Sequence, residues 1–428
     1  MGDLSLKAEC QSTNMNKLFI VIFFIALISA VPKSFDGAFQ VTPDTPEISP
    51  SDRKILEFEK DIIVTIPPKE SRTFVFRGTA GEFFRVDLEI NETYSLPKIS
   101  LYSPSGDDLL KKHFGTALIL PETGEYLLVM RQISNPFAEE SVEDEVASMR
   151  ASKRFSTTFK NSKRKTWNIG DYTANIYRFP PDSDFDERVA FEILLGGKRV
   201  YFFEEWDGGN LQINEEIANT LERPNKRSAE FWSQRDKTGD GSPDIVIQNY
   251  TGGAHCCFEY KFIELKTPIK ILPMVETQDV DLEPIDSARG GLIFKTAETV
   301  FSYWNTSFAE SPMPLVFLKF ENGELVVDSE RMRRPPPSPE EVGRMAAQAR
   351  GKINLTPYAG YENSDSQFEE PFWAPMLDLI YSGNEVTAWQ YFDQVWPEAK
   401  QGKERFRAEF KKTLGDSIFY KQVNSSKP

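Results

Sequence analysis

The sequence predicts a mainly β protein with an α-helical C-terminus. We expect an N-terminal β-sandwich, a central β-rich domain formed as a partial propeller or a sheet, and a small C-terminal helical domain. Two patterns support this fold class. Short runs of β-branched and aromatic residues, separated by turn residues, recur from residue 55 to residue 328. Beyond Glu370, the spacing of apolar residues changes to that of helices.

The length and the charge of the chain narrow the classes of protein to which it can belong. A chain of 428 residues exceeds one ordinary hydrophobic core, so two or three domains are expected. A net charge of −15 argues against a nucleic-acid-binding protein, because phosphate binding requires a basic face. The expected segments are a signal peptide at 1–30, a linker at 31–54, a β-sandwich at 55–133, a charged linker at 134–166, a β-rich domain with a calcium-type loop at 167–330, and a proline-rich linker with a helical domain at 331–428.

The N-terminus has the pattern of a secretory signal peptide. Lys17 precedes an apolar run from Leu18 to Ile28, which ends at the small residues Ser29 and Ala30. The run is too short for a comfortable membrane span, although an uncleaved anchor remains the alternative. We therefore expect a secreted or periplasmic protein with no membrane span after signal cleavage.

Residues 55–133 alternate between short strands and turns at the spacing of a β-sandwich. The strands are expected at 62–66, 73–76, 83–90, 98–102, 116–120 and 126–130. The chain here resembles the bacterial pre-peptidase C-terminal domain, a secreted β-sandwich accessory module, in the segments Phe74–Phe76, Phe84–Leu88, Ile99–Gly106 and Leu120–Val129. The resemblance covers about residues 55–132 and implies export more than any particular reaction.

Residues 134–166 change from acidic to basic, which predicts a solvated linker, with a basic face for an anionic polymer as the alternative. The clearest hairpin of the central domain has Gly196 and Gly197 at its turn. Further strands are expected at 244–250, 257–265, 291–296, 300–303, 315–320 and 324–328. After a proline-rich run, Ser338 as N-cap with Glu341 three residues later predicts the start of a helix.

The loop 236–244 arranges oxygen atoms at the spacing of a calcium site. Ligand oxygens are expected at its first, third, fifth, seventh and ninth positions, which are Asp236, Thr238, Asp240, Ser242 (through its carbonyl) and Asp244. Ca²⁺ takes six to eight oxygens at about 2.3–2.6 Å, a shell that such a loop can wrap. The apolar run that follows predicts a strand and not the second helix of an EF-hand. A polar turn without metal is the alternative.

This loop resembles the calcium loop of the FG-GAP repeats in integrin-α-type β-propellers, where it joins two strands of a blade. The resemblance implies Ca²⁺ as the cofactor, with Asp236, Asp240 and Asp244 as side-chain ligands and Thr238 in place of a commoner Asp or Asn. One clear copy is present, whereas a closed propeller needs at least four blades. The resemblance therefore supports the loop and not a complete propeller.

The run Gly252–Cys257 contains one histidine and two adjacent cysteines. It resembles a motif of exported bacterial proteins that carry the same type of loop, and this resemblance implies no activity. An exported compartment permits a disulfide between Cys256 and Cys257, although α-carbons about 3.8 Å apart would strain it. We favour this vicinal disulfide over two free thiols, and a structural turn over a transition-metal site at His255.

Catalytic motifs are scarce in the chain. It contains two histidines, His113 and His255, and neither a zinc-protease motif nor a phosphate-binding glycine loop. The segment 204–207 places acids beside Trp206, whose ring is suited to stacking on a sugar.

Three hypotheses about function follow, one of which is that calcium only stabilises the fold and binding takes place elsewhere. The favoured one is an exported calcium-binding β-protein that is not an enzyme and recognises a carbohydrate, an envelope component or a protein, with His255 and Trp206 as candidate binding residues. The alternative is a secreted, glycosidase-like hydrolase that works by carboxylates and carries the sandwich as an accessory domain.

Overall fold

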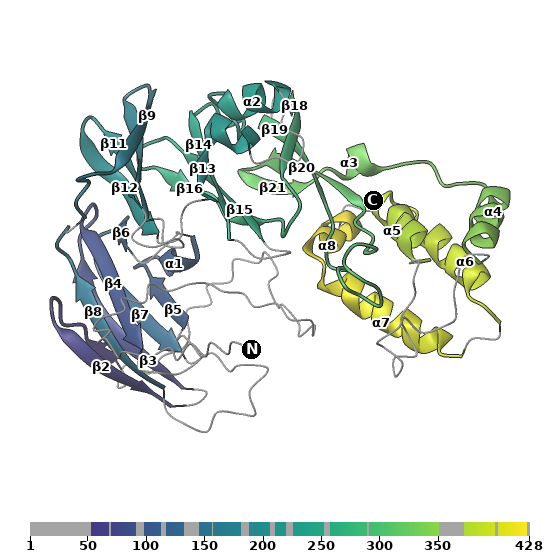
Figure 1. The fold of residues 1–428 in the computed structure, drawn as a ribbon, viewed down its shortest axis with the longest axis horizontal. Coiled ribbons are helices and arrows are strands. Elements are labelled where there is room, and N and C mark those ends of the chain that lie inside the picture. Colours follow the sequence, from purple (N-terminus) through teal and green to yellow (C-terminus); the bar gives the residue numbers. More distant parts are fainter. Residues whose placement is uncertain are drawn as a thin grey trace, which may run out of the picture. The chain divides into compact units, whose positions relative to one another are not determined.

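A computed structural model describes residues 53–67, 70–90, 98–112, 117–131, 145–155, 157–180, 188–205, 210–219, 226–251, 257–288, 291–350, 372–398 and 401–425. The expected signal peptide, both histidines, Trp206 and Cys256 lie outside these residues. The fold is mainly β with a helical C-terminal region, as the sequence predicts (Figure 1). The described residues divide into two compact units, 53–160 with 201–205, and 161–200 with 210–425.

The first unit is a sandwich of two four-stranded sheets (Figure 1). One sheet has the order β1-β3-β7-β5, formed by Arg53–Ile55, Ser71–Gly78, Gly124–Arg131 and Lys98–Tyr102. The other has the order β2-β8-β4-β6, formed by Asp61–Ile66, Glu145–Ser152, Phe83–Ile90 and Ala117–Ile119. A short helix, α1 (Leu109–Lys112), follows β5. Both sheets bury alternate residues in one core, where the rings of Phe76 and Phe84 stack with centroids 4.9 Å apart.

Part of the segment expected to be a charged linker is a central strand of this sandwich. Strand β8 pairs with β2 on one side and with β4 on the other. Its inward residues are the small or flexible Ala147, Met149 and Ala151, each fully buried, whereas Arg150 between them is exposed. Alanine and methionine have little intrinsic strand preference. The alternation of these residues with polar ones is therefore too weak to predict a strand in a segment rich in charged residues.

The second unit contains three sheets in which strands that follow one another in sequence lie side by side. The first has the order β12-β11-β10-β9, formed by Lys198–Glu205, Val189–Leu195, Tyr172–Arg178 and Lys163–Ile169. The second has the order β13-β14-β15-β16, formed by Gln212–Ile213, Asp244–Tyr250, Phe258–Glu264 and Lys270–Ile271, with β17 (Val275–Glu276) also on β15. The third has the order β18-β19-β20-β21, formed by Glu283–Ala288, Gly291–Ala297, Leu315–Glu321 and Glu324–Val327. Residues 201–205 of β12 group with the first unit.

Four strands in sequential order are the topology of one propeller blade. The described part of the chain holds three such sheets, whereas the smallest closed propellers have four blades. The predicted hairpin turns are present, since Gly196 and Gly197 both have positive φ angles (56° and 80°) between β11 and β12. Gly323, with φ 79°, turns the chain between β20 and β21 in the same way.

The strand predicted at 300–303 is wrong, because this segment forms turns. The carboxylate of Glu298 accepts the backbone N–H groups of Thr299 and Val300 at 3.0 and 2.9 Å, which folds the chain away from a sheet. Tyr303 follows in the left-handed region, with φ 60°. Phe301 is fully buried in the core. A buried aromatic residue is also typical of a strand, so the composition of this turn resembles that of a strand.

Helices follow the third sheet and gather at the C-terminal end of the chain (Figure 1). They are α3 (Ser329–Met332), α4 (Pro339–Arg350), α5 (Ala374–Tyr381), α6 (Glu385–Val395), α7 (Lys403–Asp416) and α8 (Ile418–Ser425), and two further helical elements, η3 (Asn214–Asn219) and α2 (Lys226–Ser233), precede β14. Helix α4 begins with the predicted capping box, in which Ser338 Oγ accepts from the Glu341 N–H at 3.2 Å and Glu341 Oε2 accepts from the Ser338 N–H at 2.8 Å. No helix among the described residues is long and apolar enough to cross a membrane.

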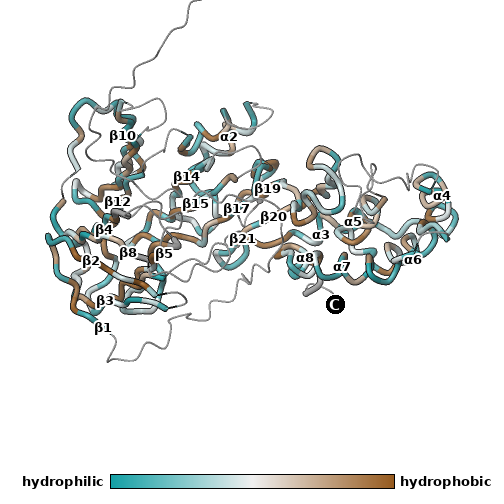
Figure 2. The backbone as a smooth tube through the Cα atoms, turned by 60° about the horizontal axis from the view of Figure 1, so that its bottom comes forward, coloured by the Kyte–Doolittle hydropathy of each residue, from teal (hydrophilic) through white to brown (hydrophobic). Residues whose placement is uncertain are grey.

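The helical region shares its core with the second and third sheets. Figure 2 shows hydrophobic stretches in strands such as β14 and β20, which contribute to this core. Buried hydrogen bonds also connect the third sheet with the helices. Glu298, which follows β19, accepts hydrogen bonds from Tyr381 of α5 and from Ser417, which precedes α8. The helices therefore dock on the β-domain of their own chain.

Candidate metal-binding loop

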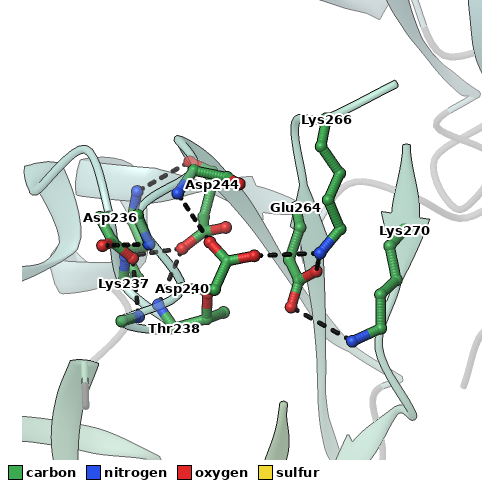
Figure 3. Close-up of polar contacts among 11 residues, drawn as sticks. Asp236, Lys237, Thr238, Asp240, Asp244, Glu264, Lys266 and Lys270 are labelled. Atoms are coloured by element: carbon green, nitrogen blue, oxygen red, sulfur yellow. Dashed lines mark hydrogen bonds and ion pairs between the residues drawn. The ribbon is translucent and has the colours of Figure 1, made fainter. Parts of the chain in front are cut away.

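The loop 236–244 lies between α2 and β14 and uses its acidic side chains to hold its own backbone (Figure 3). Asp236 accepts the N–H groups of Gly239 at 2.6 Å and Gly241 at 2.9 Å, one on each carboxylate oxygen. Asp240 Oδ1 accepts the N–H of Ser242 at 2.7 Å. These contacts curl the loop tightly, and the positive φ angles of both glycines (79° and 87°) permit the curl.

Asp244 is both the last residue of the loop and the first residue of β14, and its side chain binds the backbone at the start of the loop. Its side chain is almost fully buried, and its Oδ2 accepts the N–H groups of Lys237 at 2.6 Å and Thr238 at 2.8 Å. Burial raises the pKa of Asp244 to about 6, although these two amide hydrogen bonds, the nearby Lys237 and the Thr238 hydroxyl favour the ionised form. The carboxylate is thus turned into the loop and is costly to keep charged there.

Two oxygen atoms in the loop are buried and form no hydrogen bond of ordinary geometry among the described residues, although the Thr238 hydroxyl lies close enough to the Asp244 carboxylate to favour its ionised form. They are Asp244 Oδ1 and Thr238 Oγ1, in residues that are 1% and 5% exposed. An unpaired buried polar atom costs about 1–3 kcal/mol, so native proteins nearly always satisfy such atoms with a protein group, a water or an ion. Both atoms belong to residues at the third and ninth positions of the calcium-type pattern.

Lys237 is a buried cation inside the loop that the sequence pattern does not single out. Its side chain is 2% exposed, and its Nζ donates to the carbonyl oxygens of Gln234 at 2.6 Å and Asp244 at 3.0 Å. Burial lowers the pKa of Lys237 to about 8, against the attraction of Asp244. The buried residues of the loop are thus Lys237, Thr238 and Asp244, and the positive charge lies at the second position, where the metal-ligand pattern assigns no ligand.

A second group of charges lies beside the loop on strand β15 and the turn that follows it (Figure 3). Glu264 pairs in register with Asp244 and is 1% exposed. Lys266 forms ion pairs with Glu264 and with Asp240, and Lys270 lies 3.5 Å from Glu264. The sequence pattern misses Glu264, because its proximity comes from strand pairing across 20 residues and not from the spacing within the loop.

The start of β19 packs directly against the loop. The Leu292 N–H donates to the Lys237 carbonyl at 2.7 Å, and Gly291 has φ 101°. A side chain at Gly291 would place its Cβ 2.5 Å from the Lys237 carbonyl oxygen and 2.5 Å from the Thr238 carbonyl carbon. The loop and the third sheet therefore fix each other's position at this glycine.

The structure brings the predicted ligands Asp236, Thr238, Asp240 and Asp244 into one curled loop, where Ser242 supplies an N–H to Asp240. Across the described residues, no three acidic, histidine or cysteine side chains are grouped closely enough to hold a metal ion. The donor atoms are nevertheless of the type that calcium prefers, because all of them are oxygens. Two of these oxygens form no hydrogen bond of ordinary geometry.

Cys257, which precedes β15, lies at the opposite end of the β14–β15 hairpin from the loop. The hairpin is closed there by a hydrogen bond from the Thr251 N–H to the Cys257 carbonyl at 3.0 Å. Cys257 is buried, whereas His255 and Cys256 lie outside the described residues, so the vicinal disulfide and the role of His255 stay predictions.

The acids considered for catalysis are arranged differently. Glu204 is 5% exposed and is bound by Thr157 at 2.5 Å and by Arg85 at 3.4 Å, which is the environment of a structural ion pair. Trp206 lies outside the described residues. Another acidic pair, Glu259 and Glu276, stands directly opposite across β15 and β17. Burial, together with the charge of Glu276, raises the pKa of Glu259.

The packing at Gly291 yields a first prediction. Gly291→Ala should lower the melting temperature of the metal-free protein far more than Gly241→Ala does, because a Cβ at position 241 would meet no atom within 4 Å, whereas one at position 291 would meet the loop backbone. Both positions have positive φ, so each substitution carries a strain of about 1–2 kcal/mol, and the clash is added at Gly291 alone. Equal losses in the two variants, measured by circular dichroism, would show that the loop is not packed against β19.

The facing carboxylates yield a second prediction. Glu276→Gln should stabilise the protein near pH 7 by about 0.2–1 kcal/mol, because like charges directly opposite on paired strands repel. The raised pKa of Glu259 means that its ionisation opposes folding above that pKa, so the gain should vanish on acidification, when both groups are protonated. Glu310→Gln, at an exposed loop position, is the control. A gain that persists in acid would refute the electrostatic cause.

Comparison with known proteins adds little to this description. No protein family and no curated protein matches the chain. Two solved structures show a slight likeness, both of PliG, a periplasmic lysozyme inhibitor of g-type lysozyme. The Aeromonas hydrophila protein is 12% identical, with 23% of this chain and 94% of that chain covered and a TM-score of 0.19. The Salmonella Typhimurium protein is 19% identical, with 24% of this chain and 99% of that chain covered and a TM-score of 0.19. Likenesses with such TM-scores carry no weight for fold or function.

Proposed function

We propose that this chain is an exported calcium-binding β-protein whose 236–244 loop holds Ca²⁺. In this proposal the ion stabilises the central domain, and the protein recognises a carbohydrate, an envelope component or a protein without acting as an enzyme. Export rests on the signal-peptide pattern before residue 31, and the non-enzymatic role rests on the scarcity of catalytic motifs in the chain.

The observation that carries the calcium assignment is the pair of buried oxygens that form no hydrogen bond of ordinary geometry, Asp244 Oδ1 and Thr238 Oγ1. A cation bound between the loop carboxylates would satisfy both atoms and offset the cost of keeping Asp244 ionised in a buried position. Calcium suits this loop better than magnesium, because calcium accepts many oxygen ligands in irregular geometry whereas magnesium requires a near-ideal octahedron.

The role of calcium as a stabiliser follows from where the loop lies. It is hydrogen-bonded to β14 through Asp244 and to β19 through Lys237, so it connects the second sheet with the third. An ion that binds the folded loop and not the unfolded chain raises the stability of that connection by mass action. Recognition would then depend on surfaces that this connection holds in place.

Calcium dependence of the melting temperature tests the proposal. The mature protein, residues 31–428, should melt at a higher temperature in calcium than in excess chelator. Asp240→Ala should reduce the melting temperature in calcium much more than in chelator, because in chelator it removes one hydrogen bond and a solvent-screened ion pair, whereas in calcium it also removes a ligand. Calorimetry or circular dichroism provides the measurement. A wild-type protein that melts identically in both conditions contradicts the calcium assignment.

Thr238→Val separates the ligand role of the hydroxyl from its packing. In chelator, this nearly isosteric change should alter stability by less than about 1 kcal/mol, because the hydroxyl forms no hydrogen bond of ordinary geometry. In calcium, the same change should weaken binding, because one ligand oxygen is lost. Thr238→Ser keeps the hydroxyl and is the matched control. A larger loss of stability in chelator for the valine variant alone would show that the hydroxyl has a protein partner.

A further inference from the structure

Lys266 lies between two carboxylates at the edge of the loop (Figure 3). Its Nζ is 3.0 Å from Asp240 Oδ2 and forms a still closer ion pair with Glu264 Oε2. A lysine ammonium between two carboxylates is a cation at neutral pH. One ammonium group thus neutralises an acid of the loop and an acid of the neighbouring strand.

Backbone contacts hold this arrangement in place. The Leu265 N–H donates to the Pro243 carbonyl at 2.7 Å, which fixes the end of β15 against the end of the loop. Glu264 is opposite Asp244 in the strand register, so its buried carboxylate is near the loop whether or not a metal is bound. Lys270 approaches the other carboxylate oxygen of Glu264, at 3.5 Å, and makes no contact with Asp240.

The two oxygens of Asp240 are both engaged in this structure. Oδ1 accepts the Ser242 N–H, and Oδ2 accepts Lys266. A divalent ion that takes Asp240 as a ligand competes with the ammonium group for the negative charge of this carboxylate, since two cations repel at this separation. Lys266 can withdraw without losing all its partners, because Glu264 continues to pair with it.

We propose that Lys266 is an internal counter-cation that keeps the loop closed without metal and sets the calcium concentration at which the loop fills. The inference rests on the proposed calcium site and names the residue that regulates it. The competing ion pair is weak enough for calcium to displace, because its side chains are 40% and 26% exposed and solvent screens such pairs.

Calcium titration of charge-removed variants tests this role. Lys266→Met keeps the aliphatic stem and removes the charge, so it should bind Ca²⁺ about tenfold more tightly than the wild-type protein, which corresponds to about 1.4 kcal/mol. The same variant should melt at a lower temperature than wild type in chelator, because Asp240 and the buried Glu264 then lose a shared cation. Isothermal titration calorimetry with CaCl₂ and melting curves in chelator measure the two effects.

Lys270→Met is the matched control, because it removes a charge from the same carboxylate of Glu264 without touching Asp240. Its calcium affinity should stay close to that of wild type. Lys266→Gln provides a second charge-free variant if the methionine variant does not fold. An equal gain in affinity for the variants at positions 266 and 270 would overturn the inference, since it would show a general effect of charge.

The outcomes separate the inference from the proposed function. If wild type binds calcium and Lys266→Met binds it equally well, the inference is wrong and the calcium site stands. If neither protein binds calcium, both proposals are wrong. If only the charge-free variant binds, Lys266 fills the cation position so well that the wild-type loop is metal-free, which supports the counter-cation role and overturns the proposed calcium function.

Discussion

The buried carboxylate of Asp244 is the interaction on which the central domain depends. The residue begins β14, its Oδ2 accepts two amide N–H groups of the loop, and its carbonyl accepts the ammonium of Lys237. Its partner in the strand register is Glu264, which forms ion pairs with Lys266 and Lys270 beside the loop. Through Lys237, the same loop backbone also receives a hydrogen bond from the start of β19. One side chain thereby links a loop, a hairpin and the next sheet.

Charge around this carboxylate is balanced locally. The chain as a whole carries a net charge of −15, yet three lysines surround the acids of the loop and of β15. Burying ions without partners is expensive, so each buried acid here has a cation or amide groups within hydrogen-bonding distance. This balance helps the loop to keep its curled shape, and any cation that binds the loop meets these charges in addition to the five ligand positions.

Sequence patterns anticipated the elements whose cause is local. Adjacent glycines gave the turn between β11 and β12, Ser338 and Glu341 gave the capping box of α4, and oxygen spacing gave the curled loop at 236–244. The errors arose where side-chain contacts or packing against neighbouring elements outweigh the local pattern of apolar residues. Strand β8 forms because two neighbouring strands accept a weak alternating pattern, and residues 300–303 turn because Glu298 binds their amides and the core takes Phe301.

The sequence by itself determined the fold class, most of the strands, and the identity of the residues that line the loop, because alternation, turn chemistry and ligand spacing all act within a few residues. Only the tertiary structure decided which charges stand beside that loop. Glu264, Lys266 and Gly291 are 20 or more residues from Asp244 in the chain, and strand pairing and packing alone bring them to it. The electrostatic environment of a site is set by such long-range contacts, which leave no periodic signal in the sequence.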